Sequence, residues 1–255
     1  MGDPISRSPC FRWELLRAFI RGGMLSTNKG GATSKARTRY RVRVTRTGEA
    51  NQLSHLAQIE SLRRAVLESC LPVILDGKRT RPRPRLAFGP AIAMGYESTA
   101  EYFDLELESR VSPEDVEQAL RDSLPTGMSV HGVRRIPRFF PSIDASVNVV
   151  RYVLSGSFPG DAEHRREEFL HHNTIIVEKI KKGGERIEHV DIRPLIVTMT
   201  LATPNRLELT MRFGPKRTVK PEAVVEKWLG ETPKDLHVLR EELFSETAGG
   251  ELILP

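Results

Sequence analysis

The first regular pattern in the chain is an alternation of apolar and charged positions. Residues 39–45 read RYRVRVT, so a tyrosine and two valines alternate with three arginines. Successive side chains of a β-strand point to opposite faces, and this alternation is typical of a half-buried strand. The pattern predicts a strand whose outer, solvent-facing side carries Arg39, Arg41 and Arg43. Residues 1–38 show no such periodicity and are rich in small, polar and basic residues, so we expect a disordered basic arm.

The next segment, residues 51–71, has apolar residues at helical spacing. These residues are Leu53, Leu56, Ile59, Leu62, Val66 and Cys70. Apolar positions every three to four residues give a helix one buried face. Asn51 or Ser54 can cap the start of this helix, and Pro72 ends it.

The rest of the chain alternates short strand and helix patterns. In the first half, strands are expected at 85–95, 101–109 and 128–136, with a helix at 113–123 that begins at a proline. In the second half, strands are expected at 147–156, 174–182, 190–202, 205–214 and 236–243, with helices at 161–172 and 220–230.

The first half therefore follows a β-α-β-β-α-β order, the second half repeats this order with one additional strand, and the two halves share a short internal echo. Pro113-Glu114-Asp115-Val116 opens one predicted helix and Pro221-Glu222-Ala223-Val224 opens the other. The order is that of the ferredoxin-like fold. We predict an α+β protein with two tandem ferredoxin-like halves and antiparallel sheets. The expected divisions are a basic arm at 1–38, domains at 39–140 and 141–245, and a flexible tail at 246–255.

Composition and charge limit the classes of function. The net charge is +6, and residues 1–50 alone contribute +8, so the basic character is local. No apolar run approaches the roughly 18 residues that a membrane span needs, and no membrane association is expected. Two cysteines are too few for a disulfide framework, which favours a reducing cytoplasm.

Familiar catalytic and cofactor motifs are absent from the sequence. It contains no phosphate-binding GxxxxGK[ST], no GxGxxG, no HExxH, no CxxC and no GxSxG. It also lacks the CxxxCxxC cysteines that hold the iron–sulfur cluster of radical SAM enzymes. We therefore expect no metal and no cofactor, and we expect a non-catalytic partner protein in preference to an enzyme.

A dense group of cations precedes the predicted strand at 85–95. It consists of Lys78, Arg79, Arg81, Arg83 and Arg85, with prolines at 82 and 84. Alternating arginine and proline favours an extended segment that presents its guanidinium groups, and these bind phosphate oxygens well. Together with Arg39, Arg41 and Arg43, the group is a candidate anion or RNA-binding patch. The alternative interpretation is a solvated loop.

Single polar residues are weaker candidates. His55 follows Ser54 at the start of the predicted helix, and it could act as an acid or base toward a phosphodiester, or simply cap or pack. Asp191 and Arg193 would share a face of one strand, where they could form an ion pair or contact a ligand. Asp104 is a further isolated acid on a predicted strand.

Several motifs, in order, resemble one known family. They are the run RVTRTGE followed by LSHLAQIESLRRA, the block RPRLAFGPAIAMGYESTAEYFD, and the short stretches VDIRPL, VKPEAV and VLREEL. Together they cover roughly residues 39–243 and resemble the radical SAM-linked protein family, a domain of unknown function numbered 2344. The family usually has an aromatic residue in the proline-containing stretch before the second strand, and here residues 77–85 lack it.

The resemblance implies a partner more than a reaction. Proteins of this family are typically encoded beside, or fused to, a large radical SAM protein with a B12-binding-type domain. It therefore implies an accessory protein that binds or presents the substrate of that enzyme, with RNA as one candidate. A rival hypothesis is an RNA-binding or RNA-processing endonuclease-like protein, because tandem ferredoxin-like domains also occur in such enzymes. The oligomeric state does not follow from the sequence.

Overall fold

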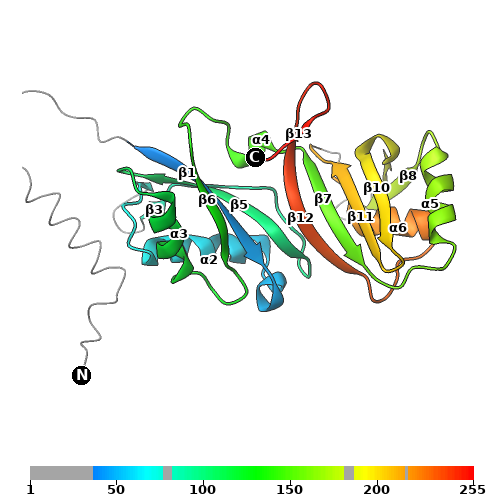
Figure 1. Ribbon diagram of the computed structural model, residues 1–255, viewed down its shortest axis with the longest axis horizontal. Helices are drawn as coiled ribbons and strands as arrows, with labels where there is room; N and C mark the ends of the chain where they lie inside the picture. The colour runs from blue at the N-terminus through cyan, green and yellow to red at the C-terminus, as the bar shows by residue number, and fades with distance from the viewer. Residues whose placement is uncertain (1–36, 77–81, 181–186, 216–217) are drawn as a thin grey trace, which may run out of the picture. The chain divides into compact units, whose positions relative to one another are not determined.

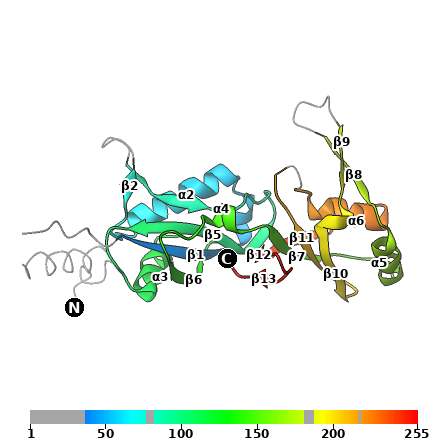
Figure 2. The ribbon, with the colours of Figure 1, turned by 90° about the horizontal axis from the view of Figure 1, so that it is seen from above.

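The computed structural model describes residues 37–76, 82–180, 187–215 and 218–255 (Figures 1 and 2). These residues form a mixed structure of helices and strands, and the strands pair mostly in antiparallel fashion. The chain divides into two compact units. Unit 1 contains the described residues up to Met94 together with Glu101–Ala145, and unit 2 contains Gly95–Ala100 and Ser146–Pro255.

Unit 1 is a sheet with two main helices. Its larger elements are β1 (Thr38–Arg46), α2 (His55–Glu68), β4 (Leu86–Phe88), β5 (Glu97–Leu107), α3 (Pro113–Arg121) and β6 (Val130–Ile136). Its shorter ones are the 3-10 helix η2 (Gly48–Gln52), β2 (Leu75–Asp76), β3 (Arg83–Pro84) and α4 (Ile143–Ser146). The strands lie in the order β4-β5-β1-β6. The strand predicted at 85–95 is therefore only three residues long.

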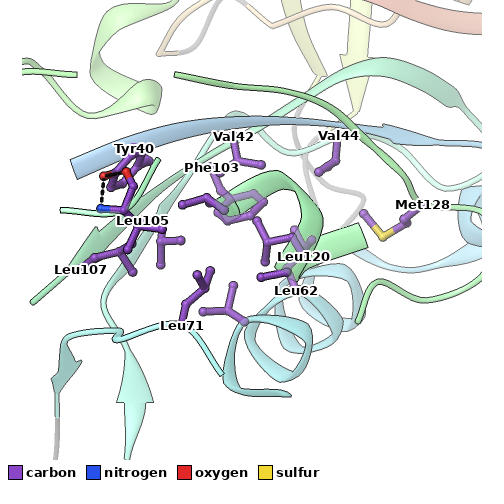
Figure 3. Close-up of a cluster of buried hydrophobic side chains, with 14 of the residues drawn as sticks. Tyr40, Val42, Val44, Leu62, Leu71, Phe103, Leu105, Leu107, Leu120 and Met128 are labelled. Carbon is purple, nitrogen blue, oxygen red and sulfur yellow. Dashed lines mark hydrogen bonds between the residues drawn. The ribbon is translucent and has the colours of Figure 1, made fainter. Parts of the chain in front are cut away.

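The core of unit 1 lies between this sheet and the two helices (Figure 3). The apolar side of β1 and the alternate residues Phe103, Leu105 and Leu107 of β5 pack against Leu62 of α2 and Leu120 of α3. The hydroxyl of Tyr40 also accepts a hydrogen bond from the amide of Val111 at 2.9 Å, which ties β1 to the segment before α3. The predicted alternation in residues 39–45 thus fixes which side of β1 is buried.

The helix predicted at 51–71 begins later than its apolar pattern indicates. Arg46 is fully buried, and its guanidinium donates to the carbonyl oxygens of Ala50, Asn51 and Leu53 at 2.7–3.0 Å. These bonds stabilise the 3-10 turn η2, and α2 starts only at His55. Helix formation is local, but this start is decided by a charged group from the preceding strand.

The buried face of α2 also differs from the prediction. Leu56 is 74% exposed, whereas Gln58 is buried, accepts from Arg46 at 3.0 Å and donates to Glu101 at 2.8 Å. A buried polar side chain is tolerated when its hydrogen bonds are made. The helix ends at Glu68, so Cys70 lies outside it, with a positive φ of 58°.

Unit 2 has a second sheet and two helices. Its elements are β7 (Val149–Ser155), α5 (Ala162–His171), β8 (Ile176–Ile180), β9 (Ile187–Asp191), η3 (Arg193–Leu195), β10 (Ile196–Thr203), β11 (Arg206–Arg212), α6 (Pro221–Leu229), β12 (His237–Glu246) and β13 (Leu252–Ile253). The main strands lie in the order β10-β11-β7-β12, and Glu97 and Ser98 at the start of β5 pair in parallel with β12.

Two expectations for unit 2 need correction. The strand predicted at 190–202 is broken by η3, because Pro194 lacks an amide donor and the chain turns there; β9 pairs instead with β8 in a separate hairpin. The expected tail at 246–255 contains β13, which pairs with Ser245 and Glu246 of β12.

The two units share one strand order. In unit 1, β1 lies between β5 and β6, and β4 is at the edge next to β5. In unit 2, β7 lies between β11 and β12, and β10 is at the edge next to β11. A helix that begins with proline precedes the outer strand of each unit: α3 precedes β6, and α6 precedes β12. Among the described residues, no helix is long and apolar enough to cross a membrane.

Candidate functional site

The arginines of β1 meet a buried carboxylate of β5. Asp104 is 2% exposed, and its two oxygens accept from Arg41 Nε at 2.7 Å, Arg41 Nη2 at 3.0 Å and Arg39 Nη2 at 2.6 Å. The amide of Ile143 donates to the same carboxylate at 3.2 Å. We call Arg39, Arg41 and Asp104 the Asp104 cluster.

The chain after β6 closes over this cluster. Arg39 Nη1 donates to the carbonyl oxygen of Phe140 at 2.6 Å, and Arg41 Nη2 donates to that of Pro141 at 3.0 Å. The ring of Phe140 lies 5.7 Å from the guanidinium carbon of Arg41. The expectation that Arg39 and Arg41 face solvent is therefore wrong: Arg41 is 1% exposed, because a carboxylate and main-chain carbonyls take its donors.

The described part of the arginine–proline segment is only partly available to an anion. Arg85 binds Asp76 at 2.7 Å and Glu106 at 3.5 Å, and its guanidinium holds the pKa of Asp76 below its usual value. Arg83 is exposed on β3. Arg43 lies over the ring of Tyr102, 5.8 Å from its centroid. Lys78, Arg79 and Arg81 lie outside the described residues.

Ser54 and His55 occupy the start of α2. The hydroxyl of Ser54 accepts a hydrogen bond from the amide of Ala57 at 3.2 Å, so Ser54, one of the two predicted caps, is the N-cap of α2. His55 is half-buried, and among the described residues its Nδ1 atom has no hydrogen-bond partner. The structure places no carboxylate on this imidazole within the part of the chain it describes.

Asp191 and Arg193 do not share a strand face. Asp191 ends β9, and its Oδ1 accepts the amides of Ile175 at 2.9 Å and Arg193 at 3.1 Å. The Arg193 side chain turns away and donates to the carbonyl of Leu170 at 3.1 Å. Both residues therefore shape the turn into η3.

Unit 1 carries exposed arginines that the sequence analysis did not select. Arg134 and Arg135 lie on β6, and Arg138 follows it; all three side chains are exposed. No ion pair joins them to any residue in the described ranges. We call these three residues the β6 arginines. The pattern VRRIPR could have indicated them, because an edge strand with adjacent arginines presents one to each side.

A pocket with a mixed polar and apolar lining lies on unit 2. It has a volume of about 470 Å³, and its charged or titratable lining residues are Glu97, Arg206, Asp235 and His237. The apolar Val153 and Leu239, the hydroxyls of Ser155 and Ser157, and Asn205 complete most of its lining. Pockets of about 300–1,000 Å³ with a few converging polar groups are typical of ligand sites.

Strand pairing brings these side chains together. Ser155 of β7 is opposite both Arg206 of β11 and His237 of β12. In the next row, Val153 of β7 is opposite Leu239 of β12. Directly paired residues project from the same face of a sheet, so both rows face one side.

Hydrogen bonds and charges define the rim of the pocket. Asp235 accepts from the amide of Ser157 at 3.0 Å and from its hydroxyl at 2.7 Å, and these bonds lower the pKa of the Asp235 carboxyl. Arg206 is 45% exposed, and the ion pairs that it makes with described residues are long, to Glu208 at 3.5 Å and to Glu241 at 3.8 Å. Sequence analysis missed this pocket because its residues come from four separate strands and loops.

A metal centre is not evident in the part of the chain that is described. Within those ranges, no group of three or more His, Cys, Asp or Glu side chains is placed to hold a metal ion. His171 and His172 end α5, and His164 is 3.5 Å from Glu168 on the same helix.

Comparison with protein families gives one match. A family model described as an uncharacterized protein conserved in bacteria (DUF2344) matches residues 39–221. The match runs from β1 to the first residue of α6, so it includes the Asp104 cluster. None of the curated proteins is similar enough to the chain to count as a match.

Proposed function

The chain belongs to the DUF2344 family of uncharacterised bacterial proteins, and on that premise we propose that it is an accessory protein that works with a B12-binding-type radical SAM protein. In this proposal it acts in the cytoplasm and binds or presents the substrate of that enzyme. The observation that carries the proposal is the ordered set of motifs over residues 39–243, which resembles the radical SAM-linked family.

The roles of the motif residues support a scaffold more than a reaction centre. Arg46, Ser54 and Gln58 come from the first motif, and they stabilise η2, α2 and the buried contact to Glu101. Asp104 ends the second motif and forms ion pairs with Arg39 and Arg41 of β1. These side chains make hydrogen bonds and ion pairs within the fold. A partner or a substrate would therefore bind to other, exposed residues.

The proposal includes two tandem ferredoxin-like halves. The shared strand order supports it, since β4-β5-β1-β6 and β10-β11-β7-β12 both correspond to the order second, third, first, fourth. The antiparallel pairs β1–β6, β4–β5, β10–β11, β11–β7 and β12–β7 agree with the same fold. On this interpretation the β8–β9 hairpin is an insertion in the second half.

RNA is the substrate class that we propose for unit 1. The β6 arginines support it, because exposed guanidinium groups on both faces of an edge strand can each contact a phosphate. They replace Arg39 and Arg41 as the candidates, since those two are consumed by Asp104. Arg83, exposed on β3, remains a separate candidate for contact with an anion.

Co-purification tests the partnership. The tagged full chain is expressed without oxygen together with a B12-binding-type radical SAM protein of the same organism, and the pair is analysed by size-exclusion chromatography. A stable complex of the two is expected. If the two proteins elute separately at micromolar concentrations, with and without substrate RNA, the partnership is refuted.

RNA binding across a salt series tests the substrate class. The variant carries Arg134→Ala, Arg135→Ala and Arg138→Ala, and each lost phosphate contact should reduce the slope of log K against log salt by about 0.7. The matched control removes three cations elsewhere, through Arg121→Ala, Arg165→Ala and Lys227→Ala, and should keep the slope. Equal slopes for both variants would refute the β6 arginines as the RNA site.

A further inference from the structure

We propose that Phe139 is a stacking platform for one unpaired base of a single-stranded RNA, with Arg134 and Arg138 on the phosphates that flank this base. The inference rests on the proposed binding of RNA by unit 1, and it specifies which form of RNA is bound. The observation that carries it is an aromatic side chain that is 90% exposed and adjoins an exposed arginine in a turn.

Phe139 is one of the two central residues of a β-turn. The turn consists of residues 137–140, and the amide of Phe140 donates to the carbonyl oxygen of Pro137 at 3.0 Å. The side chains of both central residues, Arg138 and Phe139, are exposed. The turn therefore presents a cation and an aromatic ring next to each other.

The Asp104 cluster holds the main chain of this turn in place. Arg39 Nη1 donates to the carbonyl oxygen of Phe140 at 2.6 Å, and Arg41 Nη2 donates to that of Pro141 at 3.0 Å. Both guanidinium groups are themselves bound to the buried carboxylate of Asp104. A binding group that is already held in position loses less conformational entropy when its ligand binds.

The ring of Phe139 is available to a ligand. The neighbouring ring of Phe140 lies 5.7 Å from the guanidinium carbon of Arg41. The Phe139 ring is 90% exposed, and within the described ranges it has no aromatic or cation–π contact. A nucleobase has two flat faces that can cover such a ring and remove it from water.

Two arginines accompany this ring. Arg138 adjoins Phe139 in the turn, and Arg134 of β6 is directly paired with Arg41 of β1. Paired residues project from the same face of a sheet, so Arg134 lies on the side over which residues 138–141 close. An exposed ring beside cations that have no ion pair with a described residue favours a nucleic acid over a protein, because a base can stack while the arginines bind phosphates.

Stacking on Phe139 requires an unpaired base. Each base of a duplex is already stacked between its neighbours, so its faces are covered and the ring cannot reach them. The arginines, in contrast, can contact the phosphates of a single strand or of a duplex. The inference therefore predicts a preference for single strands that depends on the ring.

Three RNA probes of equal length separate stacking from phosphate contact. They are an unstructured single strand of mixed sequence and about 12 nucleotides, an abasic strand with the same number of phosphates, and the matching duplex. Binding of each probe to the full chain is measured by fluorescence anisotropy at low salt. We expect the wild type to bind the mixed-sequence single strand about tenfold more tightly than the abasic strand.

Substitutions of Phe139 test the ring. Phe139→Ala should weaken binding of the mixed-sequence strand about tenfold and leave the abasic strand and the duplex unchanged. Phe139→Tyr keeps a ring and should bind as the wild type does, whereas Phe139→Leu keeps apolar bulk without a ring and should behave as Phe139→Ala. The slope of log K against log salt should stay the same in all three variants, because no phosphate contact is lost.

Two further variants complete the experiment. Arg134→Ala with Arg138→Ala should weaken binding of all three probes and reduce the salt slope. Leu56→Ala removes another exposed apolar side chain of unit 1, on α2, and should bind as the wild type does. Circular dichroism melting checks that each variant is folded, and Phe139→Ala should melt at the temperature of the wild type because the ring is exposed.

The results distinguish this inference from the proposed function. If Phe139→Ala binds the single strand as tightly as the wild type, stacking is overturned, and the salt slope of the β6 arginines still decides whether unit 1 binds RNA. Stacking is also overturned if the wild type binds the abasic strand as tightly as the mixed-sequence strand. If the wild type binds none of the probes at low salt, both proposals are overturned. A variant Phe139→Ala that keeps its RNA affinity but loses the complex with the radical SAM protein would assign the ring to a protein interface instead.

Discussion

Arg41 Nε lies 2.7 Å from Asp104 Oδ1, although 63 residues separate the two in the chain. Both side chains are almost completely buried. The free-energy cost of removing the two charges from water is offset by their mutual attraction and by the surrounding hydrogen bonds. This relationship buries an arginine that looks exposed in the sequence and compensates one positive charge of β1 with a carboxylate of β5.

Removal of the carboxylate should destabilise unit 1 strongly. Asp104→Ala leaves Arg39 and Arg41 without their shared partner, and loss of one member of a buried ion pair typically costs about 3–5 kcal/mol. Chemical denaturation followed by circular dichroism measures the free energy of unfolding. Arg134→Ala, which removes an exposed arginine of β6, should change it by less than about 0.5 kcal/mol. Similar values for both variants would contradict this account of the Asp104 cluster.

A glycine before β6 is required by space as well as by conformation. A Cβ atom on Gly127 would lie 2.4 Å from the carbonyl oxygen of Thr47, and the residue has a φ of 81°. Gly127→Ala should therefore lower the free energy of unfolding by more than about 2 kcal/mol, through backbone displacement added to the strain of positive φ.

The control for Gly127 is another glycine with the same conformation. Gly250 has a φ of 83° and nothing within 4 Å of its would-be Cβ atom, so Gly250→Ala reports the conformational strain without the clash. Thermal or urea unfolding of both variants measures the difference. If Gly250→Ala costs as much as Gly127→Ala, close packing against Thr47 is not the cause.

Stability at alkaline pH should depend on Tyr96. Burial, and then the hydrogen bond from its hydroxyl to Glu222, raise the pKa of Tyr96 above its usual value of about 10. The unfolded tyrosine loses its proton first, so this stabilisation is complete below about pH 10 and is lost as the pH rises beyond it. Tyr96→Phe should therefore be less stable than the wild type at pH 8, and the gap should narrow by pH 11.

Urea unfolding at both pH values measures this effect. Tyr152→Phe is the control, because the Tyr152 ring lies edge-on to Tyr96 at 6.4 Å in the same unit. A gap between wild type and Tyr96→Phe that stays constant from pH 8 to pH 11 would contradict a raised pKa at Tyr96.

His55 provides a direct test of the endonuclease hypothesis. Its imidazole is half-buried at the start of α2 and has no described hydrogen-bond partner on Nδ1. Because no carboxylate is seen to orient it, we expect labelled RNA to remain intact with both wild type and His55→Ala. The endonuclease hypothesis would be supported if the wild type cleaves RNA and His55→Ala, shown to be folded by circular dichroism, does not.

Sequence patterns predicted a helix or strand correctly where the interactions that stabilise it lie within a few residues of each other. The helix at 113–123 is observed as Pro113–Arg121, because Ser112 caps it and Pro113 suits its first turn. The alternation of Tyr40, Val42 and Val44 correctly predicted a strand and its buried side. Of the two caps predicted for the helix at 51–71, Ser54 is confirmed, and Asn51 is wrong because Arg46 holds the residues before α2 in a 3-10 turn.

Candidate residues were harder to judge, because exposure depends on what covers a face. The sequence indicates that Arg39 and Arg41 share one side of a strand, and it cannot show that residues 138–141 close over that side. The pocket is a still stronger case, since Glu97, Arg206 and His237 come together only through the pairing of β5, β12, β7 and β11.

The sequence by itself determined the kinds of most elements, the side of β1 that faces the core, and the family to which the chain belongs. These properties depend on side-chain periodicity, on caps and prolines, and on motif order, all of which can be read within a short window. Only the tertiary structure decided which charges are neutralised and which remain exposed. The physical reason is that burial and ion pairing depend on distant segments, as the 63 residues between Arg41 and Asp104 demonstrate.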